Sequence, residues 1–193
     1  MNKVLYPLMF IIVVLSMSLI FHPRTDIQNH DSNVSLPITE TDNNSNYKCP
    51  GGFAACDLVK VARVIDGDTL LTNTSERVRF VGVDTPETVK PNTPVQCYGP
   101  EASSFTKKIL TGREVWLTYK PDERQDKYGR TLAYVWLDTG NGTFELFDLT
   151  LIEQGYGRAY TVFPFDPRLE SEFVAAESQA KETKRGLWGA CAT

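Results

Sequence analysis

The sequence predicts an α+β fold, in which a small closed barrel of strands carries helices on its outside. Five short segments show the apolar alternation and turn residues of strands, and three segments show apolar residues at helical spacing. The first three strand segments follow one another directly, whereas a helical segment precedes the fourth. This order favours a five-stranded barrel like an OB-fold, with three helices.

The strand segments are separated by Asp-Gly and other polar turn residues, which end extended runs. We expect the strands at residues 58–65, 69–72, 78–83, 115–119 and 131–137. A polar loop, residues 120–130, divides the last two.

The three helical segments have recognisable starts and ends. Proline and an acid in the first turn open a helix at residues 99–101, and it runs to about Thr111 before Gly112 ends it. A short helix is expected at 147–154, where Gly155 is a natural left-handed cap. A longer one begins at Asp166-Pro167 and ends at Gly186.

The composition fits one folded domain with an appendage. The chain has 193 residues, of which 41% are hydrophobic and 23% charged, and this excludes a disordered, collagen-like or repeat-built protein. Its net charge of −4 argues against binding nucleic acid by bulk positive charge. Local phosphate binding stays open if a divalent cation neutralises clustered carboxylates.

The chain divides into three parts. Residues 1–21 carry Lys3 and then an uncharged apolar run, which is typical of a signal peptide or an N-terminal membrane anchor. Ser16 and Ser18 suit cleavage, but the apolar run continues to Phe21, so both readings stay open. Either one places the remainder outside the cytoplasm. Residues 22–48 are a polar, flexible tether, and residues 49–193 form the folded domain.

Four cysteines after an export signal favour disulfides, with three possible connectivities. Cys49 and Cys56 bracket a Pro-Gly-Gly loop, and Cys97 with Cys191 would then tie the middle of the domain to its end. Metal binding is the alternative, but the sequence has no CxxC motif and both histidines lie in the tether.

Three polar clusters are candidates for a reactive site. The first is Asp66-Gly67-Asp68, the second runs from Arg79 to Glu87, and the third is residues 126–130. Alone, each has an ordinary explanation: a tight turn, a helix capping box beginning at Asp84, and a charged loop.

Together the clusters supply what phosphodiester hydrolysis needs. Carboxylates can hold Ca²⁺ or Mg²⁺, and a carboxylate can deprotonate water. Arginines can neutralise a phosphate as charge develops. Arg79 and Asp84 are five residues apart, so on a regular strand they face opposite sides. We predict that Gly82 bends the chain between them.

These clusters resemble the staphylococcal nuclease (thermonuclease) family. Four further motifs match it in order and spacing: YGPEAS at 98–103, FTKK at 105–108, LAY at 132–134 and QG at 154–155. The resemblance covers residues 57–188, about two-thirds of the chain.

The resemblance implies a calcium-dependent nuclease. Asp68 and Asp84 would be carboxylate ligands of Ca²⁺, and the backbone carbonyl of Thr85 would be a third ligand. Glu87 would be the general base that activates the attacking water.

The basic residues would bind phosphate. The resemblance implies that Arg79 and Arg130 hold the scissile phosphate, and that Lys127 and Tyr128 contact a neighbouring terminal phosphate. Family members cut DNA and RNA and leave 3′-phosphate ends. We expect the same here, with a preference for single strands and a monomeric enzyme.

The chain departs from the family at two places. An ungapped match puts Thr161 and Phe163 where the family has two tyrosines of its base platform, with Tyr160 one residue away. Phe163 can still stack on a base. Residues 90–94 replace a lysine-rich loop, which should weaken backbone capture and soften its salt dependence.

Overall fold

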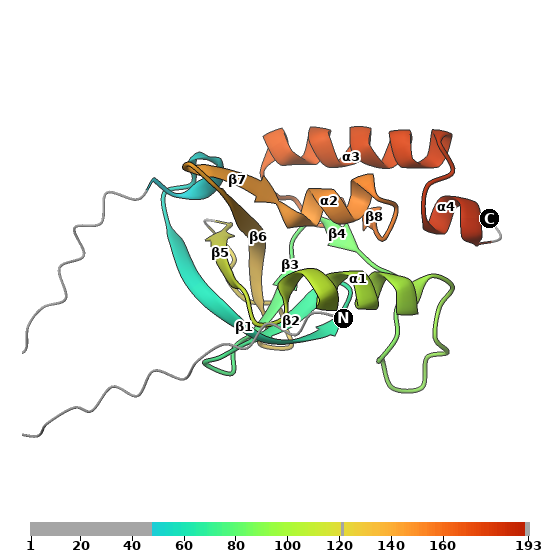
Figure 1. Ribbon diagram of the computed structural model, residues 1–193, viewed down its shortest axis with the longest axis horizontal. Helices are drawn as coiled ribbons and strands as arrows, with labels where there is room; N and C mark the ends of the chain where they lie inside the picture. Colours follow the sequence, from blue (N-terminus) through green and yellow to red (C-terminus); the bar gives the residue numbers. More distant parts are fainter. Residues whose placement is uncertain (1–47, 121, 192–193) are drawn as a thin grey trace, which may run out of the picture. The chain divides into compact units, whose positions relative to one another are not determined.

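A computed structural model describes residues 48–120 and 122–191 (Figure 1). The strands are β1 (Cys56–Asp66), β2 (Thr69–Thr72), β3 (Arg77–Phe80), β4 (Val83–Asp84), β5 (Glu114–Tyr119), β6 (Thr131–Gly140), β7 (Thr143–Leu146) and β8 (Arg158–Ala159). The helices are α1 (Gly99–Leu110), α2 (Phe147–Glu153), α3 (Pro167–Glu182) and α4 (Leu187–Ala190), with a short 3₁₀ turn, η1, at Pro50–Gly52.

The strands form a closed barrel. The sheet order is β3-β2-β1-β5-β6-β7, and β3 also pairs with β6 in parallel, with Val78 opposite Thr131. This pairing closes a ring of β1, β2, β3, β5 and β6, while β7 extends from β6 outside the ring. The predicted five-stranded barrel with three main helices is therefore confirmed.

The core joins the barrel to its helices through aromatic side chains. Phe80 of β3 meets Phe147 of α2 edge-on, at 6.2 Å between ring centroids, and Phe147 stacks on Phe105 of α1 at 5.9 Å. Phe80 and Phe147 are almost completely buried. In Figure 1, α3 lies along α2, and their buried faces meet. One continuous core therefore supports the strands on which the polar clusters lie.

One predicted strand is wrong, and one alternative explanation for the polar clusters is excluded. The strand predicted over residues 78–83 breaks into β3 and β4, because Gly82 has a φ of +76° that ends regular pairing. A helix capped by Asp84 does not form, since residues 85–98 contain neither helix nor strand.

Besides the η1 turn, three short elements were not predicted. Strand β7 follows a two-residue turn at Asn141 and Gly142, both with positive φ. An Asn-Gly pair is the usual sequence signal of a hairpin, so this strand could have been predicted. Strand β8 has two residues and pairs with β4, and α4 has four. Such short elements depend on tertiary contacts and leave no periodic pattern in a sequence.

The cysteines pair as favoured from their spacing. Cys49 is bonded to Cys56, and Cys97 is bonded to Cys191. None of the helices in the described part of the chain has both the length and the apolar character needed to cross a membrane. The proposed signal or anchor at 1–21 and the tether, except Lys48, lie outside the described residues.

Candidate active site

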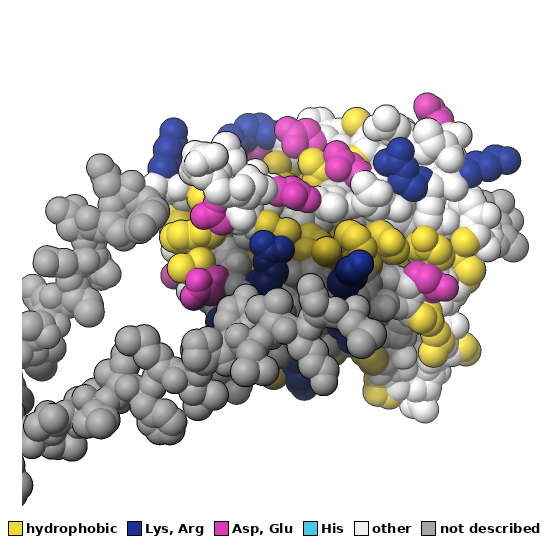
Figure 2. All heavy atoms as spheres, in the orientation of Figure 1, with side chains coloured by type: hydrophobic (Ala, Val, Ile, Leu, Met, Phe, Trp, Pro, Cys, Tyr) yellow, Lys and Arg dark blue, Asp and Glu magenta, His cyan; other side chains and the backbone are white. Residues whose placement is uncertain are grey.

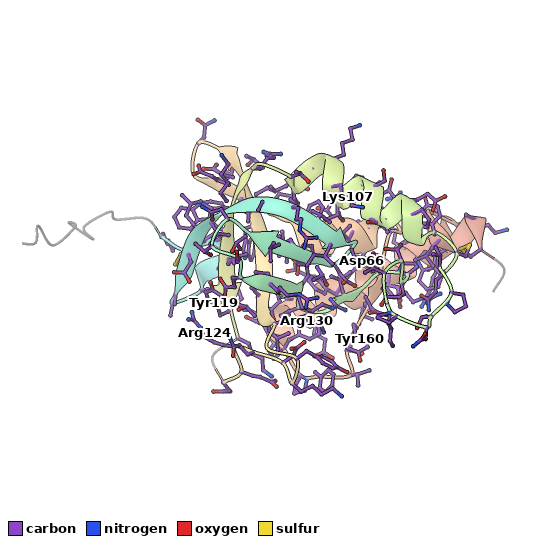
Figure 3. The ribbon with its side chains drawn as sticks, turned by 90° about the horizontal axis from the view of Figure 1, so that it is seen from below. Asp66, Lys107, Tyr119, Arg124, Arg130 and Tyr160 are labelled. Atoms are coloured by element: carbon purple, nitrogen blue, oxygen red, sulfur yellow. A yellow bond between two sulfur atoms is a disulfide. The ribbon has the colours of Figure 1, made fainter. Side chains whose placement is uncertain are left out.

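The polar clusters line one cleft of about 930 Å³. In Figure 3 the labelled Asp66, Arg130 and Tyr160 lie on the same face, although they come from β1, from the end of the β5–β6 loop and from the segment after β8. The cleft brings together every residue predicted for the site: Asp68, Arg79, Asp84, Thr85, Glu87, Lys127, Tyr128, Arg130, Tyr160 and Phe163.

Asp68 is fixed at the bottom of the cleft by hydrogen bonds. Its Oδ2 accepts from the backbone N of Thr85 at 2.9 Å and from the Thr85 hydroxyl at 3.0 Å, while its Oδ1 accepts from Thr69. A Cβ on Gly67 would lie 2.6 Å from the Thr85 hydroxyl oxygen. The Asp-Gly-Asp turn therefore needs its glycine so that β1 and β2 can approach Thr85.

Arg79 holds the two carboxylates together. Its Nη2 lies 3.0 Å from Asp84 Oδ1 and 3.3 Å from Asp68 Oδ2. Its Nη1 donates to the carbonyl oxygens of Phe80 and Val83, both at 2.7 Å. Arg79 and Asp84 face each other because the chain turns at Gly82, the irregularity without which their spacing would place them on opposite sides of a strand.

The environment suits a divalent cation. Partial burial, and then the charge of Asp68, raise the pKa of Asp84, and Arg79 opposes this shift. The converging donors are hard carboxylate oxygens, which Ca²⁺ and Mg²⁺ prefer. No set of three or more acidic, histidine or cysteine side chains suited to a metal occurs within residues 48–120 and 122–191. The two carboxylates would thus need carbonyl, water or phosphate oxygens to complete a coordination sphere.

Glu87 follows β4 in the turn that forms one wall of the cleft. Its Oε1 accepts from the backbone N–H groups of residues 88, 89 and 90, at 3.1, 3.0 and 2.9 Å. Burial favours a higher pKa for Glu87, but the hydrogen bonds from Asp66 and these amides outweigh it and lower the pKa. Glu87 is therefore a carboxylate at neutral pH, as a base requires.

Asp66 supports this wall through its contacts with Thr88. Its Oδ1 accepts from the Thr88 hydroxyl at 2.7 Å, and its Oδ2 accepts from the Thr88 backbone N at 3.2 Å. Burial, together with hydrogen bonding to Glu87, raises the pKa of Asp66. The residue that follows Glu87 is thereby fixed to the end of β1.

The opposite side of the cleft is a loop organised by Asp126. The Asp126 carboxylate accepts from the backbone N of Tyr128 at 2.9 Å and from Arg130 Nε at 2.6 Å. Tyr128 is 70% exposed, and the Arg130 guanidinium lies 5.5 Å from the centre of its ring. The loop thus presents a cation and an aromatic ring to the cleft.

The remaining aromatic residues lie at the mouth of the cleft. Tyr160 and Phe163 are 6.0 Å apart between ring centroids, and Phe163 is 63% exposed. The backbone N of Tyr160 donates to the Gly82 carbonyl at 2.7 Å. Thr161 is exposed and does not line the cleft.

A closed barrel with carboxylates and arginines in one cleft has the groups that phosphodiester cleavage needs, and comparison with known proteins shows the class of enzyme. The family described as "Staphylococcal nuclease homologue" matches residues 77–190. The thermonuclease of Staphylococcus hyicus is 47% identical over 132 residues, 67% of this chain and 74% of its own length. Endonuclease YncB of Bacillus subtilis is 30% identical over 200 residues, covering 97% and 92% of the two chains. The chain belongs to the staphylococcal nuclease family and is a nuclease, so its substrates are nucleic acids.

Proposed function

We propose that this nuclease is exported, depends on Ca²⁺, and hydrolyses DNA and RNA with low sequence specificity to leave 3′-phosphate ends. The observation that carries the proposal is the meeting of Arg79 with Asp68 and Asp84 in the cleft that Glu87 and Arg130 also line. A binding module of the same fold is the alternative, but it would have no need for this complete set of charged residues.

Asp68, Asp84 and the backbone carbonyl of Thr85 would hold the ion. When bound, Ca²⁺ would neutralise the two carboxylates and the substrate phosphate and so stabilise the charge that develops during hydrolysis.

Glu87 would take a proton from the water that attacks phosphorus in line with the leaving oxygen. The new bond joins the water oxygen to phosphorus, and the bond from phosphorus to the 5′ oxygen breaks. Arg79 and Arg130 would neutralise the negative charge that accumulates on the phosphate oxygens, and Arg130 would assist the leaving 5′ oxygen. The leaving 5′ oxygen takes up a proton from solvent and Glu87 later returns its proton to solvent, so the products are a 3′-phosphate and a 5′-hydroxyl.

The exposed ring of Phe163, with Tyr160 beside it, would stack on bases, and Lys127 and Tyr128 would contact a neighbouring terminal phosphate. Stacking needs a free base face and tolerates every base, which favours unpaired strands and low sequence specificity. On the face shown in Figure 2, basic and acidic side chains are mixed rather than gathered by sign. The chain carries a net charge of −4, so affinity would come from local contacts in the cleft rather than from bulk positive charge.

Export is supported by the apolar segment at residues 1–21 and by the two disulfides, which persist in oxidising compartments. The segment would either be cleaved or keep the enzyme on the membrane. We propose a monomer, because the cleft is completed by residues of one chain.

The test uses the full chain, unreduced, on denatured DNA and on RNA, with Ca²⁺ or with a chelator. Cleavage that needs Ca²⁺ and leaves 3′-phosphate ends is expected. Failure of the folded, calcium-supplied protein to cut either polymer would favour the binding module. Cleavage that continues in the chelator would disprove the dependence on calcium.

A further inference from the structure

The wall that carries Glu87 has no regular structure of its own. Residues 85–98 contain no helix or strand, and Val89 and Val95 are more than half exposed. One hydrogen bond between backbone groups lies within the loop tip, from Thr93 N to the Lys90 carbonyl. The position of Glu87 must therefore be set by the ends of this loop.

Gln96 closes the loop by pairing with Glu87 in both directions. The backbone N of Glu87 donates to Gln96 Oε1 at 2.9 Å, and the backbone N of Gln96 donates to the Glu87 carbonyl at 2.9 Å. The Gln96 carbonyl in turn accepts from Gly99 N, at the start of α1. A Cβ on Gly99 would meet the Glu87 carbonyl at 3.1 Å, so the helix start packs directly against the turn.

The hydrogen bonds between Gln96 and Glu87 lie on the surface, so they alone would hold the loop weakly. Gln96 and Cys97 are both exposed, so water competes for each of these hydrogen bonds. The next residue, Cys97, is covalently bonded to Cys191, which is 94 residues away in the chain.

Cys191, the other cysteine of this disulfide, follows a helix that packs against the domain. Cys191 follows α4, whose first residue, Leu187, is buried and donates its backbone N to the Gly155 carbonyl at 2.9 Å. A Cβ on Gly155 would lie 2.2 Å from the Arg185 carbonyl oxygen, so the two segments are in direct backbone contact. The disulfide thus connects the loop end to the end of α4, whose first residue is buried and hydrogen-bonded to the segment after α2.

We propose that Gln96 is a positioning residue for Glu87 and that the Cys97–Cys191 disulfide keeps Gln96 in place, so that the bonded enzyme turns over faster than one without the bond. The inference rests on the proposed role of Glu87 as the base. Small displacements of a catalytic group lower the rate of the chemical step much more than substrate binding.

The two disulfides of this chain allow a matched comparison. We expect Cys97→Ser/Cys191→Ser to lower kcat on denatured DNA by about 5- to 30-fold while KM stays within about twofold. The control, Cys49→Ser/Cys56→Ser, removes the bond beside η1 and should keep kcat within about twofold of the parent. Equal losses in both variants, at temperatures where both are folded, would overturn the proposal.

Gln96 is tested with the disulfide intact, so the proposal stays falsifiable if the cysteine variant does not fold. Gln96→Ala should lower kcat by about 5- to 30-fold, whereas Gln96→Glu, which keeps an acceptor oxygen, should recover most of it. Parental kcat in folded Gln96→Ala would overturn the positioning role.

A background of Glu87→Gln separates this proposal from the function on which it rests. If the disulfide acts through Glu87, its removal should not lower the residual rate of Glu87→Gln any further. A further loss of the same size would overturn the proposal while leaving Glu87 as the base. If Glu87→Gln itself cleaves at the parental rate, the base assignment is wrong and the proposal falls with it.

Discussion

Two regions of the cleft are built in contrasting ways. The floor, where the reaction would occur, comes from strands β3 and β4, the β1–β2 turn and the residue after β4: Asp68, Arg79, Asp84 and Thr85. The rim, where the polymer would be held, comes from loops: Lys127, Tyr128, Tyr160 and Phe163. Asp68 is 7% exposed and accepts hydrogen bonds at both carboxylate oxygens, whereas Phe163 is 63% exposed. The Asp68 carboxylate of the floor is therefore held by hydrogen bonds, whereas the Phe163 ring of the rim is exposed and open to contact with a substrate.

The largest effect should come from the base on the wall beside the floor. Glu87→Gln removes a proton acceptor with little change in shape, so we expect kcat to fall by about 1,000-fold. Folding and calcium-assisted nucleotide binding should stay close to those of the parent. Steady-state cleavage of denatured DNA and a nucleotide titration measure the two separately.

The control for this change is Glu172→Gln, which removes an exposed acid on α3 outside the cleft. It should cleave like the parent. Loss of nucleotide binding together with turnover in Glu87→Gln would mean that the wall also holds substrate, and the contrast between floor and rim would then fail.

The next effect concerns the bend that forms the floor. Gly82 has a φ of +76°, and a Cβ there would lie 2.5 Å from the ring of Phe173. We expect Gly82→Ala to lower the free energy of unfolding by about 2–4 kcal/mol and to reduce kcat, because Arg79 and Asp84 would no longer meet. Urea unfolding and cleavage assays measure both.

Gly112→Ala is the matched control, since Gly112 also has positive φ, at +78°, but no atom lies within 4 Å of its Cβ position. It should lose about 1 kcal/mol of stability and keep its activity. Equal effects of the two substitutions would show that backbone strain, rather than contact with Phe173 and the shape of the floor, explains the loss.

Gly82 also shows which part of the site geometry could be predicted from the sequence. The family resemblance implied that Arg79 and Asp84 share a site, whereas a spacing of five residues would put them on opposite faces of a regular strand; Gly82 indicated where a bend could occur. The barrel was predictable for a similar reason, because its strands repeat a local pattern. The pairing of Gln96 with Glu87 joins residues nine apart across an irregular loop, and no periodic pattern marks it. The hydrogen bonds between Asp66 and Thr88 join residues 22 apart in the chain. No local sequence pattern marks such a contact, so the sequence around Asp66 shows only a turn.

A smaller effect is expected beneath the floor, where Asp148 is completely buried. Its Oδ2 accepts from Val135 N at 2.8 Å, its Oδ1 has no partner among the described residues, and burial raises the pKa of Asp148 to about 8. The folded protein therefore keeps this proton up to about pH 8, whereas the unfolded chain releases it near pH 4. Stability should fall as the pH rises between these values.

Asp148→Asn removes this titration and keeps an oxygen for Val135. The free energy of unfolding should rise by about 1–3 kcal/mol at pH 8 and change little at pH 4. Melts at pH 4, 6 and 8 measure the difference, with the exposed Asp122→Asn as control. A gain that is equal at all three pH values would show that Asp148 does not hold a proton in the folded state.

The smallest effect should come from the rim. Phe163→Ala removes an exposed ring, so we expect KM for denatured DNA to rise by about 5- to 30-fold, equivalent to about 1–2 kcal/mol, with kcat and the melting temperature nearly unchanged. Val162→Ala is the control, because Val162 is 70% exposed and does not line the cleft. A fall in kcat with unchanged KM would mean that the ring places the phosphate on the floor. The rim would then take part in the chemistry, and the floor alone would not determine the rate.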